Sequence, residues 1–272
     1  MPKASKQKTL SPTATGDGKS GSAAPAVDRA IALMELLESR PQHAFSLAEI
    51  ARGLGIPKST ASNICTAMAL GQLARKTQNG YQLGRRLVQL GSAYVSSIDI
   101  VREFYEVSRQ ADSDLGAMIQ LAVLDDEINA VYLARQDCLS GLRLGLRAEI
   151  GRRVPANCTA AGKALLAALP LDDLEARLAA VHSLPTLTNR SISSTDKLLK
   201  ELIAVRKQGY SGEDEEVLRG VCCVAKATST NHREDGLVAI SITTMKDTLT
   251  PARKKLIHKT LTELVDQLQQ RL

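Results

Sequence analysis

The chain has 272 residues, of which 44% are hydrophobic and 3% aromatic, with a net charge of +6 and five cysteines that lack metal-ligand spacing. This length suits two domains with aliphatic cores, while the apolar runs fall short of the roughly 20 residues that span a membrane and the N-terminus lacks a secretion signal. The cysteines are too few for a disulfide scaffold, so we expect a reduced, cytoplasmic protein without metal or cofactor.

The excess positive charge lies in the first third of the chain. Residues 1–98 contain 12 Lys and Arg against 5 Asp and Glu, whereas residues 99–272 contain 23 against 24. A basic segment beside a neutral remainder indicates a polyanionic partner for that segment alone. Residues 1–25 are rich in Ser, Thr, Gly, Lys and Pro and are predicted to be a disordered arm, in which the basic charge could equally serve solubility.

Residues 26–83 carry the signals of a winged helix-turn-helix domain. Apolar spacing predicts a helix over residues 27–40. A second helix opens at Ser46, with Glu49 at capping-box distance, and a third follows Pro57, because proline suits a first helical turn. The dipeptide Asn79-Gly80 between two short strand patterns then predicts a hairpin, which would be the wing of the domain.

The third predicted helix is apolar on one face and small and polar on the other. Such a polar face lets a helix approach base edges in the major groove of B-DNA, while Lys and Arg neutralise phosphates. The alternative is the solvated face of an ordinary helical bundle, but the ordered helices, Gly-containing turn and basic hairpin favour DNA. The predicted DNA-binding residues are Lys58, Ser59, Thr60, Ser62, Asn63, Thr66, Arg75, Lys76 and Asn79.

Residues 84–98 are predicted to form a helix that links the two domains. Large apolar side chains recur there at steps of four and three, which is typical of helices that pair. Isolated helices of this length are marginal in water, so this one needs a partner, either the second domain or another subunit. We expect a homodimer in which Leu87, Leu90 and Tyr94 make the contact.

Residues 99–272 mix helices and strands without the regularity of βαβ units. This pattern predicts an α+β domain with an antiparallel sheet flanked by helices. Helices are predicted over residues 101–115, 159–169, 171–181, 195–208 and 251–272. Strands are predicted over residues 118–124, 129–134, 221–229 and 237–243, with a polar turn at 231–236.

The start of the predicted helix near Thr159 indicates an anion site. Free backbone N–H groups and the positive end of the helix dipole favour a carboxylate there, although a plain N-cap would use the same residues. The acidic residues 213–216 are either a solvated edge or a pocket wall, and Cys223 is either a buried structural cysteine or a pocket residue. The predicted effector-binding residues are Asn157, Thr159, Ala160, Ala161, Asp214, Glu215, Cys223 and Ser241.

Several short motifs follow one another in order along the chain. In the N-terminal part they are Ser46-Leu-Ala-Glu-Ile-Ala51, Leu54-Gly-Ile-Pro-Lys-Ser-Thr60 and Tyr81-Gln-Leu-Gly84. Further on they are Thr159-Ala-Ala-Gly-Lys-Ala-Leu-Leu166, residues 213–216 and residues 220–225. Together they resemble the IclR (isocitrate lyase regulator) family. This resemblance implies a GAF-like effector domain, a homodimer or a dimer of dimers (a homotetramer), and repression or activation governed by a small organic molecule.

Two segments depart from the pattern of that family. Ala61-Ser62-Asn63 stands where the family often has a bulky or basic pair, which leaves the operator sequence open. Lys226-Ala227 stands where the family often has Ala-Pro, which leaves the shape of the pocket open.

We therefore expect a sequence-specific transcription regulator, not an enzyme, that binds a double-stranded DNA operator and a small acidic or aromatic effector. Its expected parts are the arm over 1–25, the winged domain over 26–83, the linker helix over 84–98 and the effector-binding domain over 99–272. One alternative is an enzyme with a DNA-binding appendage, although no His stands near Cys223 in the sequence. Another is a structural DNA-binding protein without a ligand.

Overall fold

The computed structural model describes residues 23–109, 111, 115–138, 150–229 and 236–272. Most of the predicted arm over residues 1–25, and residues 231–235 of the predicted polar turn, lie outside the described residues. The chain divides into two compact units, which meet in sequence between Ser92 and Ala93.

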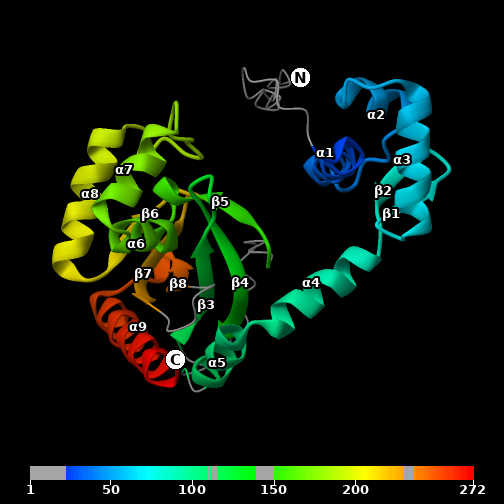
Figure 1. The fold of residues 1–272 in the computed structure, drawn as a ribbon. Helices are drawn as coiled ribbons and strands as arrows, with labels where there is room; N and C mark the ends of the chain where they lie inside the picture. Colours follow the sequence, from blue (N-terminus) through cyan, green and yellow to red (C-terminus); the bar gives the residue numbers. More distant parts are fainter. Residues whose placement is uncertain (1–22, 110, 112–114, 139–149, 230–235) are drawn as a thin grey trace, which may run out of the picture. The chain divides into compact units, whose positions relative to one another are not determined.

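The N-terminal unit contains the helices α1 to α3, a hairpin and the first part of α4 (Arg86–Ser97) (Figure 1). The helices are α1 (Pro25–Ser39), α2 (Leu47–Gly53) and α3 (Lys58–Leu70), and the strands are β1 (Ala74–Thr77) and β2 (Gly80–Leu83). The predicted capping box is confirmed, since Ser46 Oγ accepts the Glu49 N–H while a Glu49 carboxylate oxygen accepts the Ser46 N–H. Gly55, with a φ of 64°, makes the turn between α2 and α3.

The turn of the hairpin lies one residue earlier than the sequence predicts. Gln78 and Asn79 form it, and Gly80 already pairs with Thr77. Gly80 is required for another reason, because a Cβ there would lie 2.2 Å from the carbonyl oxygen of Phe45. That close approach lets β2 form a bridge between Tyr81 and Phe45, so the hairpin is joined to the segment that precedes α2.

The core of the N-terminal unit is formed by side chains from one face of each of the helices α1 to α3 and by one side chain from each strand. α3 contributes Ala61, Cys65 and Met68, which recur at helical spacing and leave the opposite face to solvent. The other buried members are Leu33, Leu37, Phe45, Ile50, Ala51, Ala74 and Tyr81.

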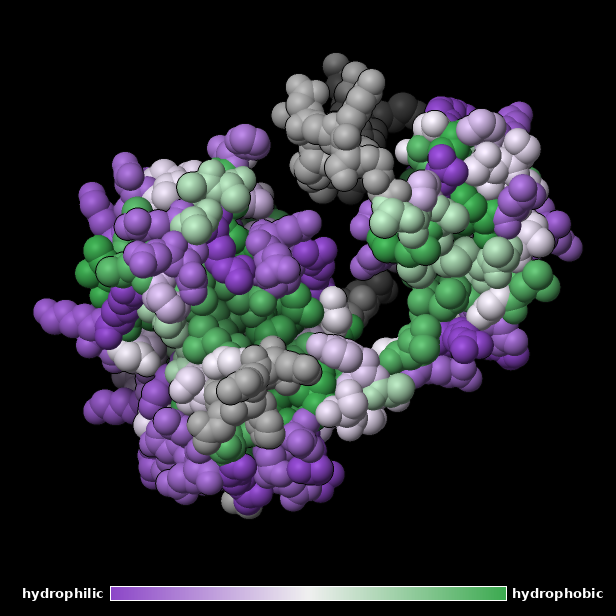
Figure 2. Space-filling view, viewed as in Figure 1, coloured by the Kyte–Doolittle hydropathy of each residue, from purple (hydrophilic) through white to green (hydrophobic). Residues whose placement is uncertain are grey.

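Helix α4 (Arg86–Ser97) exposes large apolar side chains (Figure 2). Leu90 is 50% exposed and Tyr94 is 56% exposed, while Leu87 is half-buried. Val88 is exposed as well. This is the helix that was predicted to link the domains. Its leucine side chains are only partly buried by other described residues of this single chain.

The C-terminal unit is built on one six-stranded antiparallel sheet. Its order is β5-β4-β3-β8-β7-β6, so the two long hairpins β3–β4 and β7–β8 meet in the middle. This confirms the predicted α+β fold. β5 and β6 were not predicted, because strands this short show no clear alternation of polar and apolar residues. The strands are β3 (Ala117–Leu124), β4 (Asn129–Cys138), β5 (Arg153–Pro155), β6 (Ser211–Asp214), β7 (Val221–Ser229) and β8 (Leu237–Met245).

Helices cover both faces of this sheet (Figure 1). On one face α5 (Asp99–Ser108) and α9 (Pro251–Arg271) pack on Ile119, Leu121, Ile240 and Ile242. On the other face lies α6 (Ala160–Ala168), which is backed by α7 (Leu171–Ala179) and α8 (Thr195–Gln208). Two 3₁₀ turns, η2 (Ala156–Cys158) and η3 (Lys246–Thr248), complete the unit.

Helix α5 is shorter than predicted. It ends at Ser108 rather than near Leu115, and Leu115 is buried in the core just before β3. Residues 110 and 112–114 of the predicted helix lie outside the described residues. Among the helices that the structure describes, none has the length and apolar character to cross a bilayer.

Candidate DNA interface and ligand cavity

The face of α3 opposite the core carries the predicted recognition residues. Lys58, Ser59, Asn63 and Thr66 are exposed there, and Thr60 and Ser62 are half-buried beside them. The Thr66 hydroxyl donates to the Ser62 carbonyl oxygen at 2.8 Å, which ties that side chain to the helix. Asn63 thus stands in the middle of an exposed strip of small polar side chains, where its amide has both a donor and an acceptor to offer.

The hairpin adds basic and polar groups to the same unit. Arg75 and Lys76 on β1 are exposed, and so is Asn79 at the turn. The structure records no ion pair between Lys58, Arg75 or Lys76 and any other described residue. These three charges are therefore not neutralised within the described part of the chain, as phosphate contacts require.

A small cavity of about 60 Å³ lies in the C-terminal unit, between the start of α6 and the sheet. Thr159, Ala160 and Cys223 were predicted from the sequence and line it. The other residues that line the cavity could not be predicted from a local sequence pattern, because strands that are distant in the chain bring them together. The full lining is Met118, Gln120, Tyr132, Arg152, Val154, Thr159, Ala160, Glu213, Val217, Val221, Cys223 and Thr243.

A row of polar side chains crosses the sheet beneath this cavity. The register pairs Glu213 with Cys223 and Cys223 with Thr243 on three neighbouring strands. The Thr243 hydroxyl lies 3.3 Å from Gln120 Oε1 and 3.2 Å from Cys223 Sγ. Since paired residues point to the same face of a sheet, the row gives the cavity a polar floor between apolar walls.

Glu213 is the buried carboxyl group of the cavity, 5% exposed. Burial raises its pKa to about 7, even though Oε1 accepts the N–H groups of Glu216 at 2.7 Å and Val217 at 3.1 Å. Burial also raises the pKa of the Cys223 thiol to about 12, and the pKa of Tyr132 lies well above its usual value for the same reason. Cys223 is thus a thiol at neutral pH, which argues against a nucleophilic role.

Two of the predicted residues at the start of α6 have structural partners. Asn157 Nδ2 donates to the carbonyl oxygens of Pro185 and Ile192, each at 2.8 Å, so it ties down a loop rather than lining the cavity. Thr159 is the N-cap of α6, and its hydroxyl accepts the Gly162 N–H at 2.9 Å. Ala161 is buried next to Ala160 but does not line the cavity.

The two acidic residues that were selected as effector-binding, Asp214 and Glu215, do not line the cavity, whereas Glu213 of the same acidic segment does. Asp214 follows Glu213 on β6 and therefore points to the other side, where it pairs with Arg190 at 2.8 Å and Lys246 at 2.7 Å. Glu215 pairs with the same Lys246 at 2.7 Å. These contacts lower the pKa of both carboxyl groups.

Ser241 is buried in β8, and its hydroxyl has no hydrogen-bond partner among the described residues.

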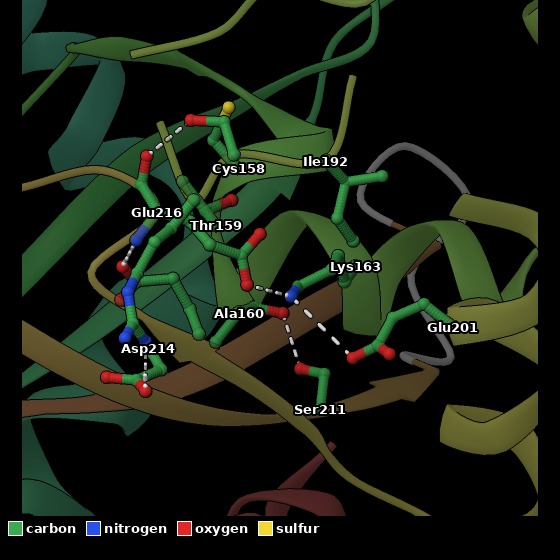
Figure 3. A network of polar contacts seen from close by, with 12 residues as sticks. Cys158, Thr159, Ala160, Lys163, Ile192, Glu201, Ser211, Asp214 and Glu216 are labelled. Atoms are coloured by element: carbon green, nitrogen blue, oxygen red, sulfur yellow. Dashed lines mark hydrogen bonds and ion pairs between the residues drawn. The ribbon is translucent and has the colours of Figure 1, made fainter. Parts of the chain in front are cut away.

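A buried ion pair, which the sequence did not indicate, adjoins the cavity (Figure 3). Lys163 of α6 is 1% exposed, and its Nζ lies 2.7 Å from Glu216 Oε1 and 3.7 Å from Glu201 Oε1. The backbone of Glu216 is in turn fixed by Glu213 and by hydroxyl groups of Thr188 and Ser191. The described residues contain no group of three or more His, Cys, Asp or Glu arranged to hold a metal ion.

Two family models match the sequence. The IclR helix-turn-helix domain matches residues 26–77, and the C-terminal domain of the bacterial transcriptional regulator IclR matches residues 92–270. Among curated proteins, the HTH-type transcriptional regulator XynR of Escherichia coli is 30% identical over 221 residues, which cover 80% of this chain and 85% of XynR. The HTH-type transcriptional regulator TtgV of Pseudomonas putida is 34% identical over 207 residues, 75% of this chain and 76% of TtgV.

Solved structures share the fold. An IclR transcriptional regulator from Alicyclobacillus acidocaldarius superposes with a TM-score of 0.76 at 20% identity, covering 90% of this chain and 97% of the other. An IclR homologue from Microbacterium hydrocarbonoxydans, complexed with 4-hydroxybenzoate, gives a TM-score of 0.67 at 18% identity, with coverage of 89% and 98%.

Proposed function

Because the chain belongs to the IclR family of bacterial transcriptional regulators, we propose that α3 reads operator DNA and that a ligand in the cavity controls this binding. The chain is accordingly a DNA-binding regulator with a C-terminal effector-binding domain, and not an enzyme. In this proposal it acts in the cytoplasm, where its operator lies. We keep the predicted boundaries, with the winged domain over 26–83, the linker over 84–98 and the effector domain over 99–272.

The observation that supports sequence-specific DNA binding is the exposed polar face of α3, together with the exposed Lys and Arg side chains of the same unit. The α3 side chains Ser59 and Asn63 contact base edges in the major groove in this proposal, and Lys58 contacts phosphate. Arg75 and Lys76 of the hairpin contact the adjacent backbone. The remaining predicted contacts are Thr60, Ser62, Thr66 and Asn79.

Replacing Asn63 by alanine should weaken binding to an operator selected from random duplexes by roughly 1–3 kcal/mol, because a base contact is lost. Binding to unrelated DNA should hardly change. Lys76→Ala should instead weaken both complexes about equally and flatten their salt dependence, because a phosphate contact carries no sequence information. Fluorescence anisotropy with both duplexes at two salt concentrations measures this. Normal discrimination by the Asn63 variant would place the recognition surface elsewhere.

We also propose that two chains pair through α4, with Leu87, Leu90 and Tyr94 at the contact. The support is the exposure of leucine and tyrosine side chains on one helix, since apolar side chains that gather on a surface mark interaction sites. A two-fold dimer presents two copies of α3 to two half-sites about one helical turn apart. Pairing of two such dimers into a tetramer is compatible with this arrangement.

The effector in this proposal is a small carboxylic acid. The first turn of α6 brings backbone N–H groups and the positive end of the helix dipole to the cavity at Thr159 and Ala160. A cavity of about 60 Å³ suits an acid of a few heavy atoms as it stands. An aromatic acid needs the walls to move, since an engineered cavity that binds benzene measures about 150 Å³.

A further inference from the structure

The cavity already contains one carboxyl group, that of Glu213, and the proposed acid would place a second carboxyl group beside it. Glu213 lines the same space as Ala160, at the start of α6. The other titratable and charged groups that face Glu213 are Cys223 of β7, Tyr132 of β4 and Lys163 of α6, with Glu216 in the turn after β6. Glu201 of α8 lies beyond Glu216, and Arg152 lies at the exposed edge of the cavity.

A second polar group, the amide of Gln120, lines the same cavity. Gln120 is 3% exposed. Its Oε1 accepts the hydroxyl of Thr243, and its Nε2 donates to no other described residue. Because this amide donor belongs to a side chain that lines the cavity and has no partner among the described residues, a ligand oxygen in the cavity would accept its hydrogen bond. This donor and the first turn of α6 both favour an anion.

We propose that the effector is a monocarboxylic acid that binds as its anion together with one proton, which Glu213 takes up from solvent. This inference rests on the proposed function, since it concerns the acid assigned there to the cavity. Two ionised carboxylates cannot share so small a space at low cost, because like charges at close range raise each other's pKa. Glu213 Oε1 keeps its two backbone N–H bonds, so the proton goes to Oε2. The O–H formed there donates to the ligand carboxylate.

The thiol and the phenol that line the cavity do not change their charge near neutral pH. Cys223 has a pKa of about 12 and the pKa of Tyr132 is raised, so both stay protonated. Lys163 and Glu216 are engaged with each other at 2.7 Å. Glu213, with a pKa of about 7, changes its charge in this range. The cavity therefore takes up its proton at Glu213.

The sign of the pH dependence follows from linkage. Without ligand, Glu213 is mostly protonated at pH 6 and mostly ionised at pH 8. An anion beside it raises its pKa further, so binding at pH 8 requires uptake of nearly one proton. The affinity should therefore fall about tenfold between pH 6 and pH 8, because the proton uptake rises from almost none at pH 6 to nearly one at pH 8 and averages about half a proton over this range. A dicarboxylic acid should bind more weakly, because its second charge finds no second proton acceptor.

The test is calorimetric titration of acetate, lactate, benzoate and 4-hydroxybenzoate into the full chain at pH 6, 7 and 8. The tightest acid is titrated again at pH 8 in two buffers that differ in ionisation enthalpy. We expect about tenfold weaker binding at pH 8 than at pH 6, and uptake of nearly one proton. Glu213→Gln should abolish both effects. Asp214→Asn, which removes the neighbouring charge on the outer side of β6, should retain them.

The outcomes separate this inference from the proposed function. An acid that shifts operator binding but binds equally well at pH 6 and pH 8, without proton uptake, would overturn the inference and leave the proposed function standing. Persistence of the pH dependence in Glu213→Gln would do the same. If none of the four acids bound at any pH, both the inference and the acidic effector would fall. Should the variant not fold, the two-buffer measurement on the wild type decides alone.

Discussion

Replacing Lys163 by methionine should lower the free energy of unfolding by about 3–5 kcal/mol at pH 8, because a buried carboxylate loses its partner. Lys163 and Glu216 are both buried, and Glu216 Oε2 already has no hydrogen-bond partner among the described residues. Without the lysine, Glu216 must either stay charged in an apolar site or take up a proton. Urea denaturation of the full chain measures the loss. Hydrogen exchange should locate it within residues 93–272.

The loss should shrink as the pH falls towards 5. Burial raises the pKa of Glu216 in the native state, and removal of Lys163 raises it further. A carboxyl group whose pKa is higher in the native state than in the unfolded state hardly lowers the free energy of unfolding below its unfolded pKa. The free energy of unfolding then falls as the pH rises through the native pKa. The double variant Lys163→Met, Glu216→Gln should recover most of the stability, because residue 216 then carries no charge. A single variant as stable as wild type at pH 8 would show that the pair is not needed.

Leu90→Asp should abolish the dimer and weaken operator binding by about a hundredfold or more, because two linked modules gain roughly 10²–10⁴ over one. Leu90 is half exposed on α4, so a charge there costs the isolated chain little. In a dimer contact the same carboxylate would be buried against its copy, which is strongly unfavourable. Sedimentation equilibrium measures the assembly, and anisotropy with the selected operator measures the affinity.

The matched control is Gln89→Asp, which places the same charge at the neighbouring exposed position of α4. It should leave assembly and DNA affinity close to wild type, because residue 89 lies off the line of Leu87, Leu90 and Tyr94. A wild-type monomer that binds its operator tightly would contradict the proposed pairing. So would a Leu90 variant that remains a dimer.

Local chemistry predicted much of the fold. The capping box at Ser46 is a signal contained within a few residues, and α8 lies over Thr195–Gln208 as expected. β7 and β8 show long runs of β-branched and small residues between polar turns. The hairpin turn was misplaced by one residue because the reason for Gly80 is its contact with Phe45, which is distant in the sequence.

The cavity was predicted only in part, because long-range strand pairing assembles it. β3 is buried on both faces over most of its length, so its sequence does not reveal which face carries Gln120. In residues 213–216 every side chain is acidic, so polarity gives no alternation. A shift of one residue in a strand exchanges its two faces, which is why Asp214 was selected and Glu213 was not.

The central claim is that a ligand in the cavity changes the affinity of the protein for its operator. The measurement is titration of the selected operator with and without the acid that binds most tightly, for wild type, Ala160→Asp and the control Ala180→Asp. Coupling of 1–3 kcal/mol predicts a change of roughly 5–150-fold in wild type and in the exposed Ala180 variant. Ala160→Asp should not respond, because its carboxylate occupies the place of the anion. Equal operator affinity of the wild type with and without the acid would contradict the account.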